Sequence, residues 1–207
     1  MQENPFRLLA ISIINGCDNF NDVKKLFVDS YLKQKVARTL GVLYDIQDSI
    51  IADLPANIIF FPWIHSKPVD YKKFNDVVLS IFSDETYLKS HYNRIKKLID
   101  SIKKYGYNPD KFPTRQGGIC GHFLTDGNNK KFFITAGNHR AAVFSALYPD
   151  KQIPIIIEGK SCFKLRDLEN RGPILDIYSS DDVNSWPAVK NKFLDKDISL
   201  KIFNSYL

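Results

Sequence analysis

The sequence has few of the features that mark secreted, membrane or zinc-binding proteins. Only three of its 207 residues are cysteine, at the widely spaced positions Cys17, Cys120 and Cys162. This number and spacing predict neither a disulfide framework nor a zinc knuckle, so we expect three small buried side chains. No run of about 18 uncharged apolar residues could span a bilayer, and the first ten residues lack the basic and apolar regions of a signal peptide. These absences predict a soluble, cytoplasmic protein.

Common signatures of catalytic and metal sites are also absent. The chain has no G-x-x-x-x-G-K-[ST] phosphate loop, no G-x-G-x-x-G fingerprint and no G-x-S-x-G nucleophile elbow. Its four histidines, at positions 65, 91, 122 and 139, show no H-x-x-x-H spacing, and no C-x-x-C pair occurs. We therefore expect no metal site built from protein ligands alone.

The composition that is present fits one globular domain with a basic surface. Hydrophobic residues make up 44% of the chain and include 15 Phe and 10 Tyr, enough for a sizeable core. The formal net charge is +6. This charge fits an anionic ligand and equally fits an ordinary solvated surface. Tyrosines among the lysines are a weak stacking signature, so nucleic-acid binding is not predicted.

The most informative stretch is residues 132–142. Its apolar first half predicts a strand, which leads through Gly137 into a helix that begins with Asn138, His139 and Arg140. The first backbone N–H groups of a helix have no partner within it and attract anions, and an arginine can add a charged contact. The pattern therefore predicts a phosphate site. The alternative is a purely structural turn in which Asn138 is only the helix N-cap.

Regular elements are predicted on both sides of this stretch, which gives a mixed α/β fold. Apolar spacing predicts a helix over 92–105 that ends at Gly106, and turn residues at 125–129 predict a hairpin of strands 119–124 and 131–136. Residues 153–157 read as a buried strand. Further expected elements are one or two helices over 22–44, a strand over 54–63 and a pair of short helices between 186 and 203.

Residues 92–158 resemble the ParB N-terminal and sulfiredoxin-like superfamily. The resemblance rests on Asn93-Arg94, the S-I-x-x-x-G helix end at 101–106, the Gly-Asn-His-Arg box at 137–140 with two alanines behind it, and Ile-Pro at 153–154. It implies a compact domain with a small mixed sheet and added N- and C-terminal helices. In that superfamily the box grips nucleotide phosphates: ATP in sulfiredoxin, ATP or ADP in free-serine kinases, and CTP in partition proteins.

Departures from the family's patterns narrow the expected activity. Asn138 stands where sulfiredoxin has its cysteine nucleophile, and residues 159–207 leave little room for a partition protein's DNA-binding and dimerisation parts. Ala136 replaces the aspartate that free-serine kinases tend to carry, which puts their acid/base scheme in doubt. Residues 181–207 resemble the closing segment of ParB-like proteins associated with surface-polysaccharide genes. We expect segments 1–91, 92–158 and 159–207 to form an extension, the nucleotide-binding core and a helical segment packed on it.

The resulting functional expectation is a nucleotide-dependent phosphotransferase. The resemblance implies ATP or ADP with Mg²⁺ as cofactor, with CTP as an alternative, and a small hydroxyl compound, such as a sugar or polysaccharide precursor, as acceptor. The residues expected to be catalytic are His139, Arg140, His122 and Asp126, with Glu158 weighed as a further base. The residues expected to bind nucleotide are Gly117, Gly118, Thr135, Gly137, Asn138, His139, Arg140, Arg94 and Ser101. The alternative is a non-catalytic nucleotide switch or DNA-associated module, and Gly117 and Gly118 are equally read as the flexible start of a strand.

Overall fold

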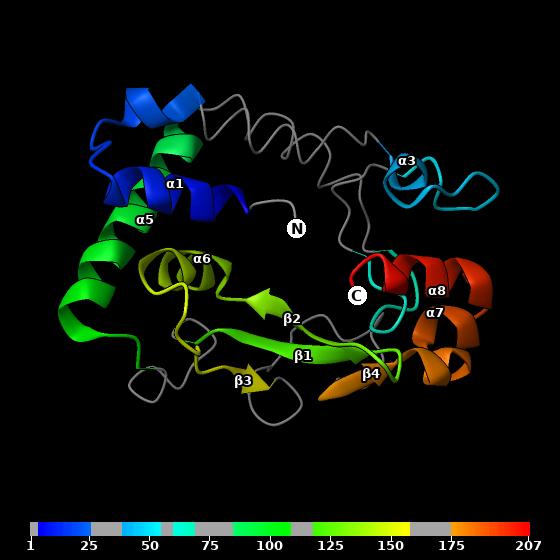
Figure 1. The fold of residues 1–207 in the computed structure, drawn as a ribbon. Helices are drawn as coiled ribbons and strands as arrows, with labels where there is room; N and C mark the ends of the chain where they lie inside the picture. Colours follow the sequence, from blue (N-terminus) through cyan, green and yellow to red (C-terminus); the bar gives the residue numbers. More distant parts are fainter. Residues whose placement is uncertain (1–3, 26–38, 55–59, 69–84, 109–117, 158–174) are drawn as a thin grey trace. The chain divides into compact units, whose positions relative to one another are not determined.

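The computed structural model describes residues 4–25, 39–54, 60–68, 85–108, 118–157 and 175–207. These residues form helices and a small mixed sheet, so the predicted α/β fold class is confirmed (Figure 1). Two compact units are found, and each is made of separated segments of chain. Unit 1 contains Met1–Val36, Val77–Cys120 and Thr135–Ile156, and unit 2 contains the remaining residues. The predicted segments 1–91 and 92–158 each contain parts of both units, whereas 159–207 belongs to unit 2 alone. The roles of the three segments as domains stay predictions.

Three helices build the core of unit 1: α1 (Pro5–Ile14), α5 (Glu85–Tyr105) and α6 (Asn138–Leu147) (Figure 1). Helix α1 begins with two favourable features. The Asn4 side chain accepts a hydrogen bond from the backbone N–H of Phe6, and Pro5 occupies the first turn, where its missing N–H costs nothing. The buried side chains that join the three helices include Leu9, Ala10, Ile13, Tyr92, Ile95, Ile99, Ile102, Val143 and Phe144.

The predicted amphipathic helix is α5, and its end is where the sequence placed it. Ile95, Ile99 and Ile102 are buried at the helical spacing of three and four residues. Gly106 follows with φ of +70°, and its N–H donates to the carbonyl of Ile102. Glycine adopts this left-handed conformation without a steric penalty, so the chain can turn away here.

The predicted hairpin consists of β1 (Cys120–Thr125) and β2 (Lys130–Ala136). In its turn, one carboxylate oxygen of Asp126 accepts from the backbone N–H groups of Asn128 and Asn129, and Gly127 has φ of +88°. Strand β1 also pairs in parallel with β4 (Ile177–Ser179).

The predicted strand over 153–157 is mostly wrong. Only β3 (Ile156–Ile157) is a strand, and it is joined to β1 by the hydrogen bond from the Ile156 N–H to the Ile119 carbonyl. Pro154 has no N–H to donate, so the residues before Ile156 cannot continue a regular ladder.

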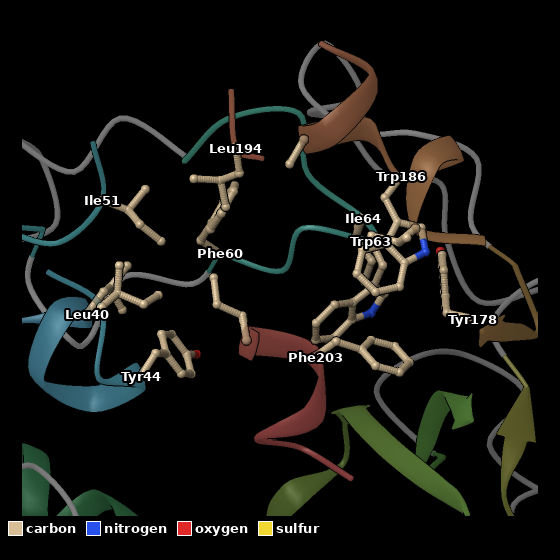
Figure 2. Packing of buried hydrophobic residues seen from close by; sticks show 14 of the residues in the cluster. Leu40, Tyr44, Ile51, Phe60, Trp63, Ile64, Tyr178, Trp186, Leu194 and Phe203 are labelled. Carbon is tan, nitrogen blue, oxygen red and sulfur yellow. The ribbon is translucent and has the colours of Figure 1, made fainter. Parts of the chain in front are cut away.

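Side chains from the helices of unit 2 form one hydrophobic cluster that includes Phe60 and Trp63 (Figure 2). The helices are α3 (Leu40–Tyr44), the 3₁₀ helix η3 (Ser180–Ser185), α7 (Pro187–Lys190) and α8 (Lys196–Asn204). The indole ring of Trp63 lies edge-on to the rings of Trp186 and Phe203, at centroid distances of 6.1 and 5.2 Å. Trp63 is therefore a core residue of unit 2. The predicted short C-terminal helices are confirmed.

Two further predictions concern the first third of the chain. Residues 20–25 are helical and α3 follows later, while the rest of the predicted helical region lies outside the described residues. Half of the predicted strand over 54–63, residues 55–59, also lies outside them, and residues 62–64 form a turn instead. Among the helices that the structure describes, none is both long and apolar enough to cross a membrane.

Candidate functional site

The turn before α6 can accommodate only glycine. Gly137 is the N-cap of the helix and has φ of +85° and ψ of 17°, in the left-handed region. A Cβ at this position would lie 2.5 Å from the carbonyl oxygen of Gly118 and 2.8 Å from the Cα of Ile119. The helix begins at Asn138, as predicted. The alternative role of Asn138 as N-cap is wrong, because Gly137 takes that place.

The start of α6 presents backbone donors. The first helical hydrogen bond runs from the Ala141 N–H to the Gly137 carbonyl, at 2.9 Å. No side chain caps the helix, and among the described residues no acceptor is bonded to the backbone N–H groups of Asn138, His139 and Arg140. These three groups lie at the positive end of the helix dipole. An anion placed here would complete their hydrogen bonding.

Two arginines add positive charge beside this helix start. Arg140 is the third residue of α6, and Arg94 projects from α5. Burial lowers the pKa of Arg140, and the charge of Arg94 lowers it further, although Tyr107 opposes this. Within the described part of the chain neither guanidinium forms an ion pair with a carboxylate. Among the described residues no carboxylate therefore neutralises these two like charges, and an anionic ligand could do so.

A pair of histidines joins α5 to α6. Nδ1 of His91 lies 2.8 Å from Nε2 of His139, and the two rings are nearly parallel. Phe6 of α1 packs on them, with ring centroids 4.2 Å from His139 and 5.3 Å from His91. Burial, followed by the charges of His91, Arg94 and Arg140, lowers the pKa of His139 to about 4. Burial and Arg94 also lower the pKa of His91, so we treat both rings as neutral at pH 7.

His91 was not among the residues predicted from the sequence to form the site. His91 lies one residue before the predicted start of the helix at 92, whereas the observed helix α5 begins at Glu85. The missed signal is its position three residues before Arg94, because residues at this spacing in a helix lie on neighbouring parts of the same surface. In the structure it contributes a second imidazole to the group around Arg94, His139 and Arg140.

The segment 118–120 forms the support of the Gly137 turn. The hydroxyl of Tyr107 accepts a hydrogen bond from the Ile119 N–H at 2.8 Å, and burial raises the pKa of this hydroxyl. Gly118 is buried, and a Cβ on it would meet the side chain of Ile156 at 2.3 Å. Gly118 is therefore closely packed. Its predicted phosphate contact stays a prediction, and Gly117 lies outside the described residues.

Two other predicted nucleotide-binding residues have identifiable surroundings. The Thr135 hydroxyl donates to the Cys120 carbonyl at 3.3 Å, which ties the end of β2 to the start of β1. Ser101 is exposed on α5, seven positions after Arg94. This spacing is close to two helical turns, so Ser101 and Arg94 lie on the same side of α5.

The predicted catalytic residues His122 and Asp126 both form hydrogen bonds that stabilise the fold. His122 is fully buried in unit 2, where its Nε2 accepts a hydrogen bond from the Trp63 indole N–H at 3.1 Å. The rings of Phe133 and Tyr178 pack on it. Asp126 organises the hairpin turn, and its hydrogen bonds, first those from the Asn129 side chain, lower its pKa. Their catalytic roles stay predictions, and Glu158 lies outside the described residues.

Two of the three cysteines lie among the described residues, and they differ in exposure. Cys120 is buried, as expected, but Cys17 is exposed, so that part of the prediction is wrong; Cys162 lies outside the described residues. Within the described ranges, no group of three or more His, Cys, Asp or Glu side chains could hold a metal ion.

Unit 1 thus brings together three residues predicted from the sequence, Arg94, His139 and Arg140. It adds His91, which was not predicted. All the groups identified at this site are cationic, neutral donors or aromatic rings. A phosphate or another compact anion is the ligand that this chemistry suits. No protein-family model, curated protein or solved structure matches the chain, so the function of this site is argued from its own residues.

Proposed function

We propose that the start of α6 binds the phosphates of a nucleotide, and that the protein transfers a phosphoryl group from ATP or ADP to a small hydroxyl compound. A sugar or polysaccharide precursor is the acceptor class we favour. The single observation that carries the proposal is the closeness of Arg94 and Arg140 beside backbone N–H donors that have no acceptor among the described residues. Such a set of donors is suited to phosphate oxygens.

The same residues suit the charge of a reacting phosphoryl group. Phosphoryl transfer asks a protein mainly to position the reactants and to stabilise charge on the phosphoryl oxygens. Arg140 can donate two parallel hydrogen bonds to such oxygens, and the neighbouring N–H groups fix their position. When Mg²⁺ accompanies the nucleotide, it neutralises part of the phosphate charge. It would be held mainly by phosphate oxygens, since the described residues contain no cluster of metal ligands.

A second candidate is a nucleotide-binding module without catalysis. It is favoured by the surroundings of His122 and Asp126, the residues predicted to act on the acceptor hydroxyl. The Nε2 of His122 is engaged by Trp63 in a core, and Asp126 is engaged by backbone and side-chain groups of its own turn. Both proposals share the phosphate site and differ only in whether turnover follows binding.

Calorimetric titration with ATP, ADP and CTP in the presence of Mg²⁺ tests the shared site. Replacing Arg140 with alanine removes a charged, two-pronged contact and should weaken nucleotide binding about 30-fold, equivalent to roughly 2 kcal/mol. Lys190→Ala is the matched control, because it removes one exposed positive charge from unit 2. Wild-type protein that binds none of these nucleotides at millimolar concentration would refute the site, as would an Arg140→Ala variant that binds like wild type.

A product assay separates the two candidates. Wild-type protein is incubated with the tightest-binding nucleotide and a panel of sugars, polyols and amino alcohols, and phosphorus NMR follows new phosphate esters. Formation of an ester that depends on both Arg140 and the acceptor supports the phosphotransferase. Tight binding with no ester from any acceptor supports the non-catalytic module.

A further inference from the structure

The hydrogen-bonded histidines suggest how the proposed phosphate site is regulated. We propose that the His91–His139 pair takes up one proton when a phosphate binds beside Arg94 and Arg140, so that the protein binds phosphate groups more tightly as the pH falls. This inference rests on the proposed function and adds a regulatory role for His91, a residue to which the sequence assigned none.

The geometry of the pair limits it to one additional proton. The 2.8 Å between Nδ1 of His91 and Nε2 of His139 requires one hydrogen between the two nitrogens. One added proton gives an imidazolium that donates to a neutral imidazole, and this strengthens the shared hydrogen bond. A second added proton would place two N–H groups against each other. The pair can therefore switch between a neutral form and a singly charged form.

The surroundings of the pair disfavour the charged form when no anion is bound. Arg94 from α5 and Arg140 from α6 both bear positive charge toward it, and Phe6 from α1 covers it with an apolar ring. Arg7 is the only titratable residue of α1. The free site thus repels a proton by burial and by like charge.

A bound phosphate reverses the sign of this local field. Two or more negative charges beside the arginines would favour the imidazolium, and the pKa of the pair in the complex would rise above its value in the free protein. Protons are then taken up on binding at any pH between the two values. Affinity increases as pH falls through the pKa of the complex and levels off below the pKa of the free protein, which for His139 is about 4. The steepest slope for one coupled proton is about tenfold per pH unit.

Calorimetry of ATP binding in two buffers with different ionisation enthalpies counts the protons taken up. Measurements at pH 5.5, 6.5 and 7.5 compare wild type with His139→Gln and His91→Gln, which keep a polar, uncharged side chain. The ionisation of ATP contributes equally to all three proteins, so the difference between wild type and variant reports the pair. We expect uptake of up to one proton by wild type at the lower pH values, and loss of that uptake in both variants.

NMR titration of the histidine rings in wild-type protein provides a readout that needs no variant. With ATP bound at pH 6, one ring of the pair should carry a proton that it lacks in the free protein. ATP binding with no extra proton, or with the same uptake in both variants, would overturn the inference and leave the phosphate site intact. Failure of wild type to bind ATP at any of the three pH values would instead refute the proposed function, and the inference with it.

Discussion

Replacing Gly137 with alanine should destabilise the protein by two separable effects. The first is conformational: a φ of +85° costs a residue with a Cβ about 1 to 2 kcal/mol. The second is steric, because the new Cβ would lie 2.5 Å from the Gly118 oxygen and 2.8 Å from the Ile119 Cα, both backbone atoms. Overpacking of this kind costs about 1 to 3 kcal/mol. We expect a total loss of about 2 to 5 kcal/mol in the free energy of unfolding.

Gly127→Ala is the matched control for this experiment. Gly127 has nearly the same φ, +88°, but a Cβ there would have no atom within 4 Å. It should therefore show the conformational cost alone, about 1 to 2 kcal/mol. Urea denaturation of wild type and both variants measures the difference, provided that the dependence on urea concentration stays the same. ATP binding should weaken in Gly137→Ala and be unchanged in Gly127→Ala. Equal losses of stability in the two variants would refute the close packing of Gly137 against Gly118.

Three further predictions concern other parts of the chain. Trp63→Phe removes the indole N–H donor to buried His122 and should lower the free energy of unfolding by about 1 to 3 kcal/mol beyond the packing loss, measured by urea denaturation; a loss below 1 kcal/mol would contradict a buried, required hydrogen bond. Cys17→Ser should be silent, and Cys120→Ser should cost about 1 kcal/mol while leaving nucleotide binding intact, so abolished binding by a folded variant would point to a role for the thiol. The pKa of His139 is about 4 in the folded protein, lower than its ordinary 6.5, so the unfolded chain binds the proton more readily and the free energy of unfolding should fall as pH drops from about 6.5 toward 4. Thermal melts of His139→Gln should show a weaker pH dependence in this window. An unchanged pH dependence would exclude His139 as its source.

Local features of the chain were predictable because their causes are local. A glycine between a strand and a helix, a helix end at Gly106 and an Asp-Gly turn each act within a few residues, and the structure has all three. The predicted strand over 153–157 was mostly wrong for a reason present in the sequence itself, because Pro154 cannot donate a ladder hydrogen bond. A prediction that took Pro154 into account would have given a shorter strand.

The candidate site was only partly predictable because its members come from distant positions. His91 and His139 are separated by 48 positions, and the third ring, Phe6, comes from yet another helix. No local pattern fixes such a meeting, which depends on how α1, α5 and α6 pack. The burial of His122 could have been predicted from the alternation of residues along its strand. Cys120, His122 and Leu124 alternate along β1, and all three are buried, as expected for one face of a strand.

The discontinuous composition of unit 1 has a consequence for how the protein is made. Helix α1 packs with α6, so its partner leaves the ribosome only after more than a hundred further residues have been synthesised. Contacts between such distant positions give the chain a high contact order, which slows folding and prolongs exposure of apolar helix faces. A recombinant fragment limited to residues 92–158 would lack α1 and the first turns of α5, and with them Phe6 and His91. Nascent chains released before residue 147 are therefore expected to remain aggregation-prone.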